Sequence, residues 1–112
     1  QTTQLNDYAL ATLANVARKI APLGSQIAIE GHTDSSGGQS AANWRLSGER
    51  ALAAQAALLQ AGLPGDRVAE VIARAASQPL FPDQPERPEN RRIVITIIAK
   101  GNTLPKDVSF RF

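Results

Sequence analysis

The chain has 112 residues, of which 43% are hydrophobic and 20% are charged, a size and balance that suit one compact, ordered domain. It contains no cysteine, which excludes a disulfide framework and a cysteine-based zinc site. The formal net charge is only +2 and the arginines are scattered among acidic residues, so no basic block favours nucleic-acid binding.

The first element that we expect is a helix over residues 4–21. Its apolar residues recur near one stripe of a helix: Leu5, Tyr8, Leu13, Val16 and Ile20. Pro22 and Gly24 then end it. The residues before this helix do not resemble a signal peptide, and no apolar run approaches the roughly 20 residues that cross a bilayer. We therefore expect an excised soluble piece of a longer protein.

Residues 26–30 alternate apolar and polar or small side chains, which predicts a strand with Ile27 and Ile29 facing a core. Residues 31–42 are rich in Gly, Ser, Thr and Asp and predict an exposed loop. Loops of this kind often carry function.

Residues 46–61 are almost saturated with Ala and Leu, which predicts a second helix with Ser47 as its N-cap and Gly62 as its stop. A short apolar segment over residues 68–73 predicts a second strand. Four prolines within residues 76–88 then predict an ordered but irregular crossing, because each proline lacks a backbone donor.

Residues 93–98 consist of β-branched side chains throughout, which predicts an interior strand with both faces at least partly covered. Helices would then pack against this sheet. The tail after Gly101 alternates again over residues 108–112, a pattern that fits either an added edge strand or a segment docked on a neighbour.

Three polar stretches stand out: Gly31-His32-Thr33-Asp34, Asn43-Trp44-Arg45-Leu46-Ser47-Gly48-Glu49-Arg50-Ala51 and Asn90-Arg91-Arg92. The first follows a strand, the second begins a helix and the third enters the last strand. One loop joining strand and helix can bring Asp34 close to Arg50, beside amides at the helix N-terminus that attract an anion. Such a site suits a zwitterion, with Asp34 holding an ammonium and Arg50 with the helix amides holding a carboxylate.

These motifs closely resemble the OmpA-like peptidoglycan-binding domain over about residues 27–98, and three motifs in the right order are a strong signal. The resemblance implies an α/β (α+β) two-layer sandwich, a mixed sheet with helices packed on one face. It implies that Asp34 and Arg50 bind the diaminopimelate of the peptidoglycan stem peptide. The full set of peptidoglycan-binding residues that we predict comprises Thr33, Asp34, Asn43, Leu46, Ser47, Arg50 and Arg92.

Within this family the chain looks most like the MotB branch, the stator proteins of the flagellar motor, on residues 43–47, 71–76 and 88–93. That resemblance implies a homodimer beside a MotA-type stator subunit. It also implies the periplasmic domain of a Gram-negative inner-membrane protein, whose single N-terminal transmembrane helix lies outside this sequence. We expect an N-terminal helix over residues 1–24, an OmpA-like core over residues 25–100 and a tail over residues 101–112.

Several of these side chains could have a structural role instead of a functional one. Asp34 with Arg50 could be a structural ion pair that pins the loop to the helix. His32 is the only histidine, so we expect no multi-histidine metal site, no bound metal or cofactor, and a histidine that braces the loop. Arg91 and Arg92 should point oppositely if both lie in a strand, and we expect Arg92 to be nearer the site.

Function also has alternatives. The leading expectation is a non-enzymatic anchor that binds the cell wall and holds a stator to it. The same anchoring role could belong to an outer-membrane lipoprotein or a secretion-system component. A peptidoglycan hydrolase is the rival from another class, but one histidine and no cysteine cannot form a zinc amidase site, and no nucleophile elbow is present.

Overall fold

The computed structural model describes residues 5–34, 41–78, 81–84 and 90–98, and the backbone of residues 106–111. Its helices and strands, in chain order, are α1 (Asp7–Ile20), β1 (Gln26–His32), α2 (Ala41–Gln60), β2 (Val68–Ala75), β3 (Arg92–Ile98) and β4 (Lys106–Arg111). Short 3-10 turns, η1 (Ala21–Leu23) and η3 (Gly65–Arg67), follow α1 and precede β2. None of the helices described is long and apolar enough to span a membrane.

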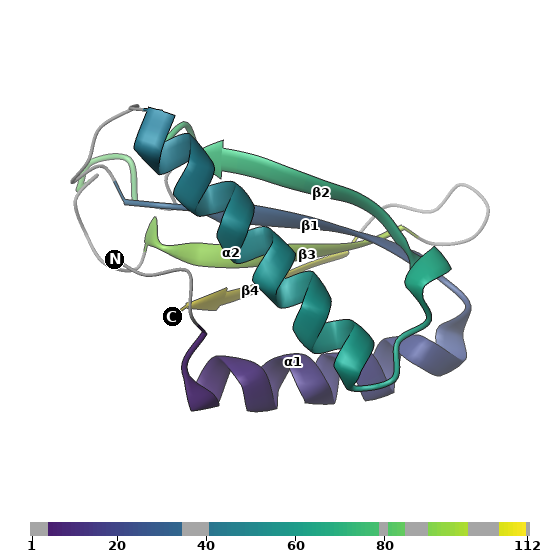
Figure 1. The fold of residues 1–112 in the computed structure, drawn as a ribbon. Helices are drawn as coiled ribbons and strands as arrows, with labels where there is room; N and C mark the ends of the chain where they lie inside the picture. The colour runs from purple at the N-terminus through teal and green to yellow at the C-terminus, as the bar shows by residue number, and fades with distance from the viewer. Residues whose placement is uncertain (1–4, 35–40, 79–80, 85–89, 99–105, 112) are drawn as a thin grey trace.

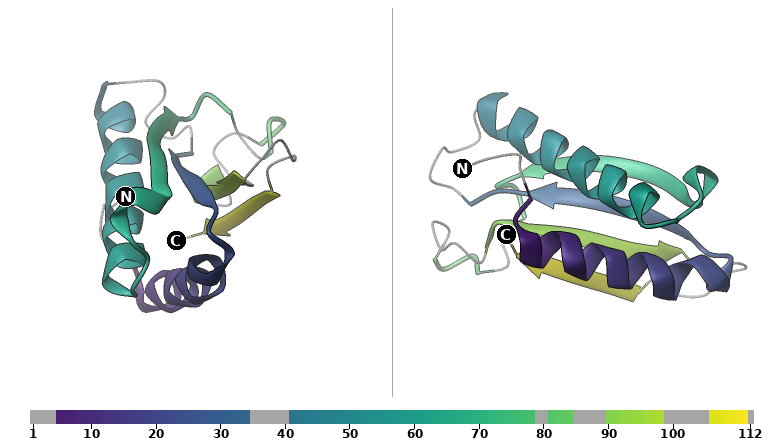
Figure 2. Two further views of the ribbon diagram at one scale, coloured as in Figure 1. Left: turned by 90° about the vertical axis from the view of Figure 1, so that its right-hand side faces the viewer. Right: turned by 60° about the horizontal axis from the view of Figure 1, so that its bottom comes forward.

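The four strands form one mixed sheet in the order β2-β1-β3-β4. β1 runs parallel to β2 and antiparallel to β3, and β3 runs antiparallel to β4. Both helices lie on one face of this sheet, as the three views together show (Figures 1 and 2). The predicted two-layer architecture is therefore confirmed. Of the two readings of the tail, the structure has the edge strand, β4.

The core lies between the helices and the sheet. β1 and β3 contribute the isoleucines that face it, which include the predicted Ile27 and Ile29. α2 meets them with small residues and one leucine, and α1 closes the end of the layer. The buried apolar side chains are Leu13, Ala17, Ile20, Ile27, Ile29, Ala51, Ala54, Leu58, Leu63, Ile93 and Ile95.

α2 approaches β1 very closely at one point. A Cβ atom built on Gly31 would lie 2.0 Å from the carbonyl oxygen of Ser47, so only glycine fits at this position of β1. Gly48 of the same helix leaves more room, because its added Cβ would lie 3.5 Å from the Cβ of Ala73. This close approach fixes the height of α2 above the strand that leads into the polar motif.

α1 is held to the sheet by polar contacts at its end as well as by apolar packing. Asn6 caps its start, accepting a hydrogen bond of 2.8 Å from the amide of Ala9. At its end the guanidinium of Arg67 donates to three carbonyl oxygens, those of Ile20, Ala21 and Ser25. These contacts satisfy carbonyl groups that a helix end leaves without an intrahelical partner.

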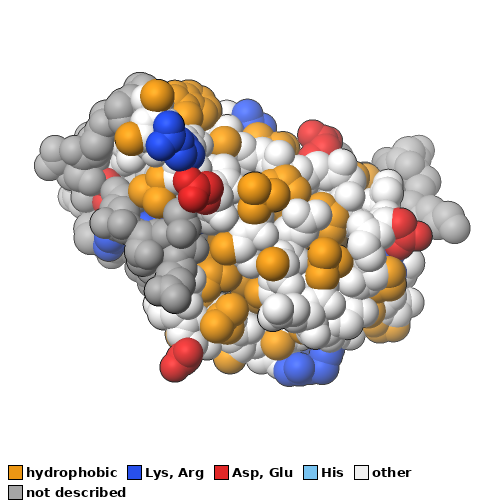
Figure 3. All heavy atoms as spheres, in the orientation of Figure 1, with side chains coloured by type: hydrophobic (Ala, Val, Ile, Leu, Met, Phe, Trp, Pro, Cys, Tyr) orange, Lys and Arg blue, Asp and Glu red, His pale blue; other side chains and the backbone are white. Residues whose placement is uncertain are grey.

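The outer face of the molecule is mixed. Trp44, Leu52 and Leu59 of α2 are exposed, and Figure 3 shows apolar side chains on this face interspersed with polar and charged ones. Scattered exposed apolar residues of this kind are normal on a folded protein.

The start of α2 differs from the prediction. The helix begins at Ala41, so Ser47 is not its N-cap and lies in its second turn. Residues 35–40, which make up half of the predicted loop, lie outside the described part of the chain. β2 extends two residues beyond the predicted 68–73, and β3 begins one residue earlier than predicted.

Candidate functional site

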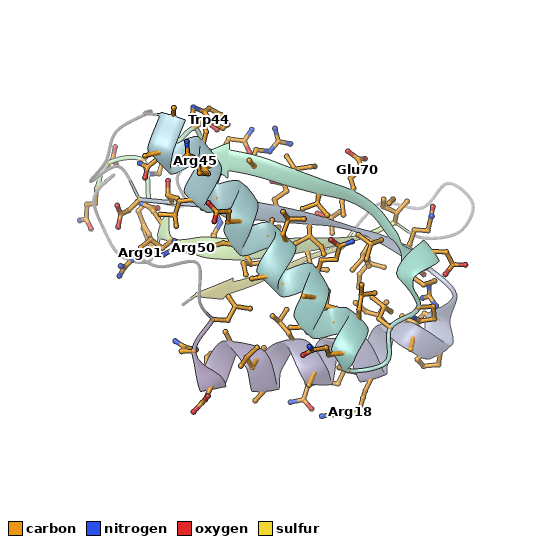
Figure 4. The ribbon with its side chains drawn as sticks, in the orientation of Figure 1. Arg18, Trp44, Arg45, Arg50, Glu70 and Arg91 are labelled. Carbon is orange, nitrogen blue, oxygen red and sulfur yellow. The ribbon has the colours of Figure 1, made fainter. Side chains whose placement is uncertain are left out.

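The three polar motifs meet at one end of the sheet. β1 ends at His32, and Thr33 and Asp34 follow directly. Figure 4 shows Arg50 of α2 and Arg91, the residue before β3, at this same end. The structure thus brings together segments that are more than fifty residues apart in the sequence.

The buried face of α2 carries the polar residues of the second motif. Asn43, Ser47 and Arg50 are 5%, 0% and 2% exposed, and they continue the stripe of α2 that further along is formed by Ala51, Ala54 and Leu58. Their spacing of four and three residues places them on one side of a helix. Leu46 is half-buried beside them.

Asp34 is nearly buried, with 4% of its surface exposed. Its Oδ2 lies 3.4 Å from Nε of Arg91, whose side chain is 30% exposed. Burying a carboxylate is costly unless a charge or hydrogen-bond partner lies beside it, and Arg91 supplies one.

Arg50 belongs to the same cluster. Burial, assisted by the nearby charge of Arg91 and opposed by the charge of Asp34, lowers its pKa to about 10. Arg50 therefore stays protonated at neutral pH. The cluster holds two guanidinium groups and one carboxylate, an arrangement that can bind a carboxylate through the arginines and an ammonium through Asp34.

The prediction that Arg92 rather than Arg91 lies nearer Asp34 is wrong. β3 begins at Arg92, and because Ile93 faces the helices, Arg92 points to the opposite face of the sheet. There it is paired across the strands with His32 and donates a hydrogen bond of 3.1 Å to the carbonyl of Gln78. Arg91 precedes the strand, so the alternation of strand side chains does not set its direction.

Ser47 acts on the backbone around the site. Its Oγ donates to the carbonyl of Trp44 at 2.9 Å and accepts a hydrogen bond from the amide of Ala75 at 3.0 Å. The carbonyl of Ala75 in turn accepts the amide of Thr33 at 2.9 Å. Ala75 has a φ of 49°, a left-handed conformation that side chains other than glycine adopt at a cost.

A second polar cluster lies on the face of the sheet that the helices do not cover. Glu30 accepts contacts from Nε2 of His32 and Nε of Arg74, each at 3.2 Å. Burial, assisted by the charge of Arg92, lowers the pKa of His32 to about 4 against the opposing charge of Glu30. His32 is therefore neutral at physiological pH and braces the end of β1 through Glu30.

Asn90 organises the crossing before β3. It is fully buried, its Oδ1 accepts from the amide of Phe81 at 2.8 Å, and its Nδ2 donates to the carbonyl of Gln84 at 3.0 Å. The side chain thus ties residues 81–84 to the start of β3, next to Arg91. Residues 79–80 and 85–88 of the predicted proline-rich segment lie outside the described residues.

No group of three or more potential metal ligands occurs within the part of the chain that the structure describes.

The OmpA family model matches residues 1–94. The chain belongs to the OmpA family. The resemblance inferred from the three motifs is therefore confirmed, including its MotB-like character, because the relatives of this OmpA domain carry flagellar names.

Among these relatives, a protein of Escherichia coli O44:H18 named for flagellar export and assembly, LafU, is 36% identical over 102 residues, which are 89% of this chain and 33% of that protein. Motility protein B of Escherichia coli K12 is 33% identical over 96 residues, 79% of this chain and 31% of that protein. The chain thus spans about a third of the length of these relatives.

Two solved structures share the OmpA fold. The C-terminal domain of Helicobacter pylori MotB has a TM-score of 0.74 at 18% identity, and the match covers 91% of this chain and 81% of the MotB chain. The cell wall anchor of the type VI secretion system of Pseudomonas aeruginosa has a TM-score of 0.69 at 23% identity, and the match covers 88% of this chain and 72% of the anchor chain.

Proposed function

We propose that this domain binds peptidoglycan without catalysis, by holding the diaminopimelate of the stem peptide, and so anchors a flagellar stator to the cell wall. The observation that carries the proposal is the nearly buried Asp34 beside Arg50 and Arg91 at the end of β1. Diaminopimelate offers an ammonium and a carboxylate on one carbon, and the cluster offers a group of the opposite charge for each.

The amides at the N-terminus of α2, which the sequence suggested as part of the carboxylate site, lie too far from Arg50 to share a ligand group with it. Arg50 lies in the third turn of α2, because the helix begins at Ala41. The free amides of a helix N-terminus lie within its first turn. The ligand carboxylate is therefore held by the guanidinium of Arg50 alone, a charge-assisted contact that burial strengthens.

The stator assignment rests on the flagellar names of the relatives. We propose that the chain is the periplasmic domain of a Gram-negative inner-membrane protein and works as a homodimer beside a MotA-type subunit. A dimer that engages two stem peptides would anchor firmly even if each site binds weakly, because the second contact is intramolecular.

A second candidate is the same anchoring function in a secretion system or outer-membrane lipoprotein. The fold shared with the type VI secretion anchor supports it. The sequence upstream of Gln1 separates the two candidates: one membrane span supports a stator, and a lipobox supports a lipoprotein.

A peptidoglycan hydrolase is the less favoured function. A glycosidase needs two carboxyl groups, one of them kept protonated by its surroundings. Asp34 instead has two guanidinium groups nearby. Incubation with purified muropeptides should therefore release no product, and measurable turnover would contradict a purely binding role.

Sedimentation with purified sacculi tests the binding proposal. We expect Asp34→Asn and Arg50→Gln each to weaken retention at least tenfold, because each removes one charge-assisted contact of the buried site. Arg18→Gln, an exposed arginine of α1 far from the site (Figure 4), is the control and should bind like the unchanged protein. Circular dichroism verifies that each variant is folded, and retention of a folded Asp34→Asn would refute the proposal.

A further inference from the structure

The carboxylate that should receive the ligand's ammonium is already covered. The side chain of Asp34 is only 6% exposed, and Arg91 lies 3.4 Å from it. With so little of the Asp34 side chain exposed, an ammonium group from solvent reaches Oδ2 only if Arg91 leaves this position. Full access to the carboxylate therefore requires that one neighbour of Asp34 moves.

The two arginines differ in their freedom to move. Arg50 is 2% exposed and sits on the buried stripe of α2, so its displacement would disturb the layer between helix and sheet. Arg91 lies outside the ladder of β3, and its side chain is 30% exposed. Because 30% of the Arg91 side chain already reaches water, its move into solvent disturbs less packing than a move of Arg50 would. Arg91 is consequently the neighbour that can leave.

We propose that Arg91 occupies the ammonium position of the empty site and that a ligand binds by exchanging its own ammonium for this guanidinium. The inference rests on the proposed function and adds to it a residue that sets specificity. Asp34 keeps a cationic partner in both states, so the buried carboxylate is never left without a counter-charge.

The charges in the cluster explain why the exchange must occur. Two guanidinium groups already act on one carboxylate, and the charge of Arg91 opposes protonated Arg50. An ammonium placed against Asp34 while Arg91 remains there would bring two cations to the same carboxylate oxygen, and like charges in close contact repel. Departure of Arg91 to solvent removes that repulsion and leaves Arg50 for the ligand's carboxylate.

The exchange makes the site selective for a charged amine. A ligand whose amine is acetylated brings no positive charge to Asp34 and cannot replace Arg91. Diaminopimelate carries both groups that the site requires, an ammonium for Asp34 and a carboxylate for Arg50. Cadaverine, which has the same spacing of two amines but no carboxylates, isolates the exchange step from the contact with Arg50.

The test compares Arg91→Gln with the unchanged protein by NMR titration with cadaverine and with meso-diaminopimelate. Without the internal competitor, we expect Arg91→Gln to bind cadaverine about two- to fivefold more tightly, in line with the modest free energy of an ion pair that is open to solvent on the Arg91 side. Arg91→Lys keeps a cation and should stay within about twofold of the unchanged protein. Arg18→Gln removes the same charge at a remote site and should change nothing.

Equal or weaker cadaverine binding by folded Arg91→Gln would overturn the exchange and make Arg91 an ordinary contact of the ligand. If that result accompanies normal sacculus retention by the unchanged protein, the exchange alone fails. If the unchanged protein retains neither sacculi nor diaminopimelate, the proposed function fails and the exchange with it.

Discussion

Ser47 is a residue of the binding motif that supports the backbone of the site through hydrogen bonds. Its hydroxyl joins the carbonyl of Trp44 in α2 to the amide of Ala75 at the end of β2. Because Ala75 also accepts the amide of Thr33, this one hydroxyl supports the backbone that leads to Asp34. We therefore regard Ser47 as a residue that positions the site.

Replacement of Ser47 by Ala tests this role. The amide of Ala75, in a fully buried residue, would lose its partner, and we expect a loss of about 1–3 kcal/mol in the free energy of unfolding. Urea denaturation measures it. Ser77→Ala is the control, because the hydroxyl of Ser77 makes an exposed contact with the carbonyl of Arg74, and it should change stability by less than about 0.5 kcal/mol. An equal effect of both variants would contradict the role of Ser47.

Sequence patterns predicted Asp34 and Arg50 as neighbours, and the effect of Asp34 on the pKa of Arg50 agrees with that proximity. They did not predict Arg91 as the partner of Asp34. Strand alternation could decide between Arg91 and Arg92 only if both residues lay in a strand, and β3 begins at Arg92. The boundary of one element thus decided which guanidinium faces the site.

At the level of elements, the start of α2 depended on packing that local sequence does not show. Asn43 and Gly48 are poor helix formers, so residues 41–45 had a low helix propensity in their local sequence. In the fold, Asn43, Ser47 and Arg50 share the buried stripe of the helix, so tertiary contacts stabilise this first part. The periodic and β-branched segments, in contrast, predicted α1 and β3 to within a few residues, because burial and propensity agree there.

The close contact between α2 and β1 gives a prediction with an internal control. Gly31→Ala would place a Cβ 2.0 Å from a backbone oxygen, and we expect a loss of about 2 kcal/mol or more in unfolding free energy, with weaker sacculus retention as α2 shifts. Gly48→Ala, in α2 itself, meets only Cβ of Ala73 in β2, at 3.5 Å. It should stabilise the protein by about 0.5–1 kcal/mol, because alanine favours the helix. Thermal unfolding distinguishes the two, and a tolerated Gly31→Ala would show that the layers can separate freely.

For the molecule as a whole, the two faces of the sheet carry different chemistry. The helices cover an apolar face, and the opposite face holds the cluster of Glu30, His32, Arg74 and Arg92. His32 is 1% exposed and neutral in the folded protein, because burial lowers its pKa. In the unfolded chain its pKa returns to the ordinary value near 6.5.

This difference links acid to global stability. Below about pH 6.5 the unfolded chain gains a proton on His32 that the folded protein does not take up until about pH 4. The contribution is therefore complete above pH 6.5 and declines as the pH falls, by about 1 kcal/mol between pH 7 and pH 5.5. Urea denaturation at both pH values measures this decline, which should largely vanish in His32→Gln. An unchanged slope in that variant would assign the acid sensitivity to other groups.

The three bonds from Arg67 determine how the N-terminal helix would transmit a mechanical load. One guanidinium connects the last turn of α1 and the residue before β1 to the turn that leads into β2. A pull along α1 would thus reach two neighbouring strands at once, and the force would be shared across their ladder of parallel hydrogen bonds. Helix and sheet would resist such tension as one rigid body.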